Sequence, residues 1–126
     1  MSDPMIAIEV QEVAHAGTEW RLRWQVTNTS SDPVRLVSVQ APHGKFRAEP
    51  MALNKMLVET AAVEQMVRVD AAPGEDIENA FVIFLVGSGD QTWRVLFRLR
   101  VHISDDGAPA PVIEAITSHP VGFTEA

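Results

Sequence analysis

Residues 92–103 carry the sequence TWRVLFRLRVHI, in which apolar and polar residues alternate almost without interruption. Successive side chains of a β-strand point to opposite faces, so this alternation places one set in a core and the other toward solvent. The inward set contains Trp93, Val95, Phe97, Leu99, Val101 and Ile103. The outward set contains Arg94, Leu96, Arg98, Arg100 and His102. The pattern predicts a long β-strand with one buried face.

Residues 18–28, TEWRLRWQVTN, show the same alternation, and weaker strand patterns occur at 6–13, 33–41, 63–70, 77–86 and 111–118. The apolar phase shifts before Val13 and again near Leu36, and each shift indicates a β-bulge. The unbroken apolar run from 80 to 86 is typical of a central strand that is buried on both faces or covered by a partner. The predicted core contains Trp20, Leu22, Trp24, Val26, Phe81, Ile83, Trp93, Val95, Phe97 and Leu99.

Turn-forming residues cluster between these runs, at 28–33, 73–76, 87–90 and 105–109. Residues 45–62 are ambiguous, because their apolar spacing fits a short helix near 51–60 while residues 56–59 fit an edge strand equally well. Helix propensity slightly favours a non-strand connection there. The sequence therefore predicts an all-β, antiparallel β-sandwich of seven to eight strands, with room for one short helix near 51–60.

Composition indicates a single folded domain over residues 1–126. The chain has 126 residues, of which 46% are hydrophobic and 21% charged, and we expect a loosely held tail at 119–126 whose one anchor is Phe123. The absence of cysteine excludes disulfides and thiolate metal sites. The first five residues lack the features of a signal peptide, so a cytoplasmic location is expected. The net charge of −7 argues against nucleic acid or an anionic membrane as a partner.

The order of these features resembles a known group of domains. WRLRWQVTN at 20–28, with the turn at 29–33 and the apolar strand after it, resembles the second and third strands of bacterial immunoglobulin-like and fibronectin type III-like domains. VDAAPGE at 69–75 is similar to the turn that precedes their fifth strand, and residues 93–101 stand where the sixth strand would be. The resemblance covers about residues 5–118 and implies an immunoglobulin-like sandwich, without implying an activity. The chain departs from antibody-type domains, since it has neither their cysteine pair nor any tyrosine.

The outward row of residues 92–103 is the candidate interaction face. Arg94, Arg98 and Arg100 are three of the ten basic residues of an acidic protein, and successive outward side chains stand about 7 Å apart. Such a row can meet carboxylates or phosphates. The more ordinary interpretation is that these arginines pair across strands with acids such as Glu114. Leu96 within the row favours contact with a protein partner or a second copy, through this face or through a sheet edge.

Metal and catalytic motifs are missing from the sequence. His15, His43, His102 and His119 have no metal-ligand spacing, and His43 with Met51 and Met56 only weakly suggests copper. Asp105 and Asp106 lack the other ligands of a calcium loop, so a hairpin turn is expected there. No nucleophile elbow, phosphate-binding loop or paired acids are present.

We therefore expect no catalytic residue, no cofactor and no metal, and interpret the chain as a non-catalytic protein-interaction or accessory domain. One alternative is a proteinase inhibitor that uses an exposed loop near 41–50. The other is a small-ligand or metal-binding sandwich, or an enzyme.

Overall fold

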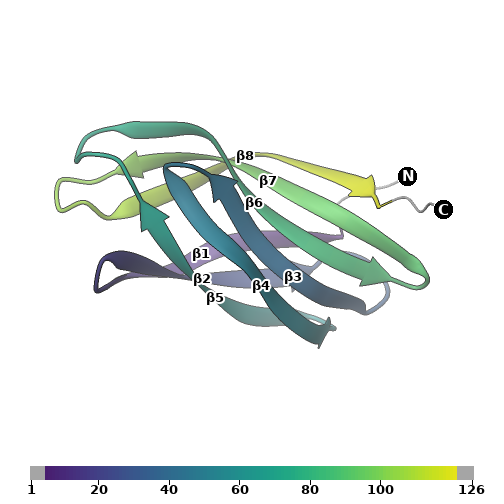
Figure 1. Ribbon diagram of the computed structural model, residues 1–126. Coiled ribbons are helices and arrows are strands. Elements are labelled where there is room, and N and C mark those ends of the chain that lie inside the picture. Colours follow the sequence, from purple (N-terminus) through teal and green to yellow (C-terminus); the bar gives the residue numbers. More distant parts are fainter. Residues whose placement is uncertain (1–4, 122–126) are drawn as a thin grey trace.

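The computed structural model describes residues 5–121, and all the regular structure in this range is β-strand (Figure 1). The strands are β1 (Ile6–Ala16), β2 (Glu19–Asn28), β3 (Val34–His43), β4 (Phe46–Leu57), β5 (Thr60–Val69), β6 (Asp76–Ser88), β7 (Gln91–Ile103) and β8 (Pro109–Pro120). They form one sheet in the order β1-β2-β5-β4-β3-β6-β7-β8, with antiparallel neighbours throughout. The prediction of an all-β antiparallel fold is confirmed.

The sheet curls into a half-barrel, with β1, β2 and β5 behind β3, β4 and β6 in the view of Figure 1. The shortest ladder joins β4 and β5, which pair only through Phe46 with Val69 and Arg47 with Arg68. The register of β3 with β4 shifts twice, between Leu36 and Ser38 and between Val39 and Ala41. Such irregularities bend and twist a strand. β4 thus pairs with β3 along most of its length but with β5 only at its first two residues.

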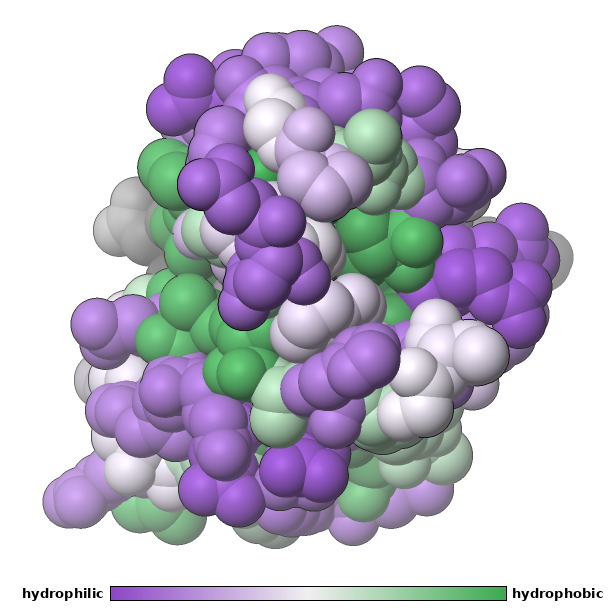
Figure 2. Space-filling model, turned by 90° about the vertical axis from the view of Figure 1, so that its left-hand side faces the viewer, coloured by the Kyte–Doolittle hydropathy of each residue, from purple (hydrophilic) through white to green (hydrophobic). Residues whose placement is uncertain are grey.

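One end of the half-barrel is covered partly by Trp20. This end, at the left of Figure 1, carries the β1–β2 hairpin and the turn between β7 and β8. A Cβ atom on Gly107 in that turn would lie 4.0 Å from Cζ2 of Trp20, so the indole packs against the turn. Figure 2 shows hydrophobic residues in the middle of this end, surrounded by hydrophilic ones. Trp20 thus connects β2 to the far side of the curled sheet.

The core lies inside the curl and takes buried residues from each of β1 to β7, with long inward rows on β2, β6 and β7. Its central members are Leu22, Trp24, Val26, Val82, Phe84, Val86, Val95, Phe97 and Leu99. Phe84 and Phe97 meet edge to face, with ring centroids 5.9 Å apart and an interplanar angle of 86°, a favourable arrangement for aromatic rings. The inward phases predicted for 20–28 and 92–103 are therefore largely confirmed.

The prediction of a short helix near 51–60 is wrong. Residues 46–57 form β4 and residues 60–69 form β5, with only Val58 and Glu59 between them. The apolar residues do not alternate regularly here because β4 is an irregular strand. Asn54 adopts a φ of 50°, and Met56 is 60% exposed while its neighbour Leu57 is buried. Pairing with β3 overrides the local helix propensity.

The predicted phase of residues 80–86 is also wrong. Ala80, Val82, Phe84 and Val86 are buried, whereas Phe81, Ile83 and Leu85 are only half-buried on the opposite face. An apolar run without alternation contains no signal for its phase, and the register with β7 shifts between Ile77 and Ala80. Among residues 5–121, the expected burial on both faces therefore does not occur. Trp20 and Trp93, predicted as core, are half-buried at its margin.

Both predicted bulges are confirmed, by register shifts between Val10 and Glu12 and between Leu36 and Ser38. The predicted tail begins too early, because His119 and Pro120 belong to β8 and the N–H of Val121 donates to the carbonyl of Thr92 at 2.8 Å. Long pairing of β8 with β7 holds this segment in place. Phe123 lies outside the described residues. Nowhere in residues 5–121 is there a helix long and apolar enough to cross a membrane.

Candidate functional site

The outward row of β7 lies beside an apolar row of β6. Strand register sets Leu96 opposite Ile83, Arg94 opposite Leu85, and Arg98 opposite Phe81. Residues directly opposite in an antiparallel pair share a face of the sheet. We name the surface made by these residues and Arg100 the outer face; its members are Phe81, Ile83, Leu85, Arg94, Leu96, Arg98 and Arg100. The sequence predicted the four β7 residues of this group but not the three of β6.

Arg35 of β3 adds a fourth guanidinium at the Leu85 end of the outer face. It pairs in register with Gly87 of β6, and a Cβ atom on that glycine would lie 3.1 Å from Nη2 of Arg35. The guanidinium therefore occupies the space that a side chain would fill. The sequence placed Gly87 in a turn, although a glycine inside a strand often marks such a close approach. The glycine at position 87 could therefore have indicated that another residue approaches β6 closely there.

The outer face keeps a positive charge after its ion pairs are counted. Glu114 of β8 lies 4.0 Å from Nε of Arg98 and 3.7 Å from Nε of Arg100, so one carboxylate serves two guanidinium groups. Glu114 is the extra residue where the register of β8 shifts, and such a bulge redirects a side chain. This is the cross-strand pairing expected from the sequence. Within residues 5–121, Arg35 and Arg94 form no ion pair.

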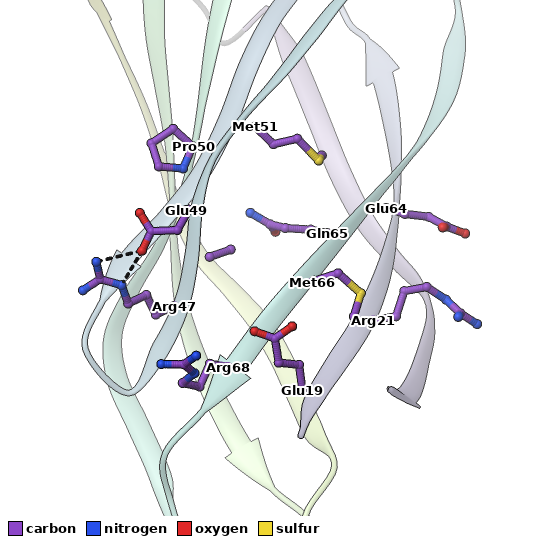
Figure 3. A pocket seen from close by; sticks show the side chains of 11 residues that line it. Glu19, Arg21, Arg47, Glu49, Pro50, Met51, Glu64, Gln65, Met66 and Arg68 are labelled. Atoms are coloured by element: carbon purple, nitrogen blue, oxygen red, sulfur yellow. Dashed lines mark hydrogen bonds and ion pairs between the residues drawn. The ribbon is translucent and has the colours of Figure 1, made fainter. Parts of the chain in front are cut away.

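A second feature, which we name the β4–β5 cleft, opens where these strands separate (Figure 3). It has a volume of about 530 Å³ and is lined by Glu19, Arg21, Arg47, Ala48, Glu49, Pro50, Met51, Glu64, Gln65, Met66 and Arg68. Gln65 is only 2% exposed. Its Oε1 accepts a hydrogen bond from Nε1 of Trp24 at 3.0 Å, while its Nε2 has no hydrogen-bond partner among the described residues. No pattern in the sequence predicts this cleft.

Two ion pairs occupy part of the rim of the cleft. Nη2 of Arg47 lies 2.8 Å from Oε2 of Glu49, and the guanidinium of Arg23 donates to Oε2 of Glu64 at 2.8 and 3.3 Å. The hydrogen bond from Arg23 lowers the pKa of Glu64; burial opposes this effect, and the charges of Arg23 and Arg21 reinforce it. The same hydrogen bond raises the pKa of Arg23. Arg23 of the neighbouring strand β2 therefore favours the ionised form of Glu64.

The histidines and aspartates considered as metal ligands form hydrogen bonds or ion pairs in or near turns. Nδ1 of His43 accepts the backbone N–H of Lys45 at 3.0 Å. Asp106 accepts hydrogen bonds from the hydroxyl of Ser104 and the N–H of Ala108, and these lower its pKa. His102 pairs with Asp76 at 2.7 Å. In the part of the chain that the structure describes, no three His, Asp or Glu side chains gather as metal ligands.

The segment 41–50, expected as the exposed loop of a proteinase inhibitor, is a β-hairpin. This segment consists of the end of β3, a turn at Gly44 and Lys45, and the start of β4. Ala41, Phe46 and Ala48 are buried in it. Pro42, Lys45 and Arg47 are exposed on either side of and within the turn, so the proteinase-inhibitor alternative stays a prediction.

Comparisons with known proteins identify no relative. No protein-family model matches the chain. The curated proteins and the solved structures likewise contain no significant match. The function must therefore be inferred from the residues themselves.

Proposed function

We propose that this protein is a non-catalytic interaction domain whose outer face binds a protein that carries acidic side chains around an apolar centre. The proposal rests on one observation: a half-buried apolar row lies beside arginines of which, among residues 5–121, only Arg98 and Arg100 have an ion-pair partner, the shared Glu114. Interfaces combine an apolar, desolvated centre with a polar rim, and arginine is enriched in them. Acidic partner residues would complement Arg35, Arg94 and Arg98.

The chemistry of the outer face favours a different protein over a second copy. In a symmetric dimer the same patch faces itself, so the arginine rows of two copies would meet. Like charges brought together in a contact of reduced dielectric disfavour that complex. The partner is therefore a separate protein with a complementary acidic surface.

We also infer that the curled sheet is an immunoglobulin-like sandwich. Its layers would be β1-β2-β5 and β4-β3-β6-β7-β8, joined only by the two residue pairs of β4 with β5. The pattern of residues 20–33 and 69–75 supports this arrangement. In such an arrangement the outer face would be the solvent side of the larger layer, which leaves it open to a partner.

The proposal is tested by photo-crosslinking from position 117, which lies opposite Leu96 at the edge of the outer face. The full chain with a photoreactive residue at Thr117 is expressed in its native cells, and the crosslinked protein is identified. Its affinity is then measured for the wild type, for R94E/R98E, and for the control R47E, whose charge lies on β4. We expect at least a tenfold loss for R94E/R98E, equivalent to about 1.4 kcal/mol, and no loss for the control.

Salt provides the second measurement. Affinity should fall as ionic strength rises from about 0.05 to about 0.5 M, because screening weakens charge pairs at the rim. Absence of any crosslinked protein, or equal binding by R94E/R98E and the wild type, would contradict the proposal.

A further inference from the structure

We propose that the β4–β5 cleft binds a small organic carboxylate with an apolar body, whose carboxylate oxygen accepts a hydrogen bond from Nε2 of Gln65. This site is separate from the outer face and does not depend on the function proposed for it. Its residues come from β2, β4 and β5.

The orientation of the Gln65 amide determines what the ligand must offer. The indole N–H of Trp24 can only donate, so the amide oxygen of Gln65 must face it, as the 3.0 Å contact shows. The amide nitrogen then points away from Trp24 and can only donate. Because Gln65 is 2% exposed and Nε2 has no partner among the described residues, a donor is left unsatisfied at the wall of the cleft. A ligand that supplies an oxygen acceptor satisfies it.

The apolar side of the cleft matches a hydrocarbon or aromatic body. The apolar residues that line it are Ala48, Pro50 and Met51 of β4 and Met66 of β5. In Figure 3, Met51 lies on the same side of β5 as the Gln65 side chain, whereas Met66 lies on the opposite side of that strand. Methionine side chains are flexible and polarizable, so they adapt to ligands of different shape. A volume of about 530 Å³ falls within the range of small-molecule sites.

The rim of the cleft favours an anion. Arg47 is neutralised by Glu49, and Glu64 is engaged by Arg23. Of the remaining charged residues that line the cleft, Arg21 and Arg68 are basic and Glu19 is acidic, and none of them has an ion pair in residues 5–121. The lining as a whole is balanced, with three arginines and three glutamates, but two of its three unpaired charged groups are guanidiniums, which attract a carboxylate.

The edge of β4 disfavours a peptide strand as the occupant. Strand addition needs a regular series of backbone donors and acceptors. Pro50 has no N–H, and Asn54 has a φ of 50°, so β4 presents an interrupted edge of the kind that protects sheets from pairing. A small molecule needs no such ladder.

The test uses the full, ¹⁵N-labelled chain, titrated separately with phenylacetate, benzoate and hexanoate and followed by NMR. The readouts are the side-chain NH₂ of Gln65 and the indole N–H of Trp24. We expect at least one acid to shift both signals saturably, with a Kd of about 1 mM or tighter. Phenethylamine, which carries the same ring as phenylacetate and a positive charge, should not.

Two variants test the assigned contacts. Gln65→Met removes the donor and should weaken binding at least tenfold, whereas the matched control Gln25→Met, on the exposed side of β2, should not. Arg68→Gln, at an exposed position, should weaken binding by about threefold to tenfold even if Gln65→Met does not fold. The proposal is overturned if none of the three acids shifts the Gln65 signal up to about 10 mM, or if folded Gln65→Met binds as well as the wild type.

Discussion

At the scale of single residues, the three tryptophans occupy different environments. Trp24 is 1% exposed, and its indole N–H is satisfied by Gln65. Trp20 is half-buried and lies against His15, with ring centroids 4.7 Å apart. Trp93 is half-buried near the end of β7. The expectation of three core tryptophans therefore holds for Trp24 alone, because the ends of a strand reach the margin of the core.

Iodide quenching should distinguish these tryptophans. In a variant with Trp20→Phe and Trp93→Phe, the remaining Trp24 should emit at short wavelength and resist iodide, because a charged quencher cannot enter the core. Variants that retain only Trp20 or only Trp93 should be quenched measurably. Equal quenching of all three single-tryptophan proteins would show that Trp24 is not enclosed as described.

At the scale of strands, Arg23 connects the three adjacent strands β1, β2 and β5. It lies on β2, directly opposite Glu64 of β5, and its Nη1 is 3.8 Å from Oε1 of Glu12 on β1. Exposed ion pairs contribute little individually. Their effect is visible chiefly through pH, because the pKa of Glu64 is lowered in the folded protein.

Acid should weaken the fold in part through Glu64. A carboxyl group whose folded pKa is lowered stabilises the native state above its unfolded pKa, and this contribution is lost as pH falls through the folded pKa. Urea midpoints should therefore decrease from neutral pH into the acid range, and the decrease should be smaller for Glu64→Gln. The exposed Glu78 of β6 provides the control Glu78→Gln. An acid dependence of Glu64→Gln identical to that of the wild type would contradict the assigned effect.

At the scale of the whole molecule, charge is distributed unevenly. The chain carries a net charge of −7, yet Arg35, Arg94, Arg98 and Arg100 gather on one side of the sheet, where Glu114 pairs with Arg98 and Arg100. This distribution attracts an acidic partner to one surface and opposes the meeting of two identical surfaces.

Sedimentation should therefore show a monomer. We expect one species of about 13.8 kDa up to about 100 µM at moderate ionic strength, because a symmetric contact would align the arginine rows. R94E/R98E serves as the comparison and should also remain monomeric. A wild-type dimer that R94E/R98E abolishes would contradict this expectation and identify a second copy as the occupant of the outer face.

The sequence alone determined the all-β class, the strands at 20–28 and 92–103, and the bulges after Val10 and Leu36. Alternation with a period of two is a local property, so a single strand displays it before any partner is known. The same alternation placed Arg94, Leu96, Arg98 and Arg100 on one face. The sequence therefore predicted the buried and exposed faces of a strand only where polar and apolar residues alternate within that strand.

Only the tertiary structure decided the rest. Residues 46–57 became a strand because β3 supplies their hydrogen bonds, and the uniform run at 80–86 received its phase from the register with β7. The position of Arg35 over Gly87 and the unpaired Nε2 of Gln65 depend on strands far apart in sequence. Such contacts are set by how the sheet curls, and the curl follows from the packing of the whole core, which no local pattern contains.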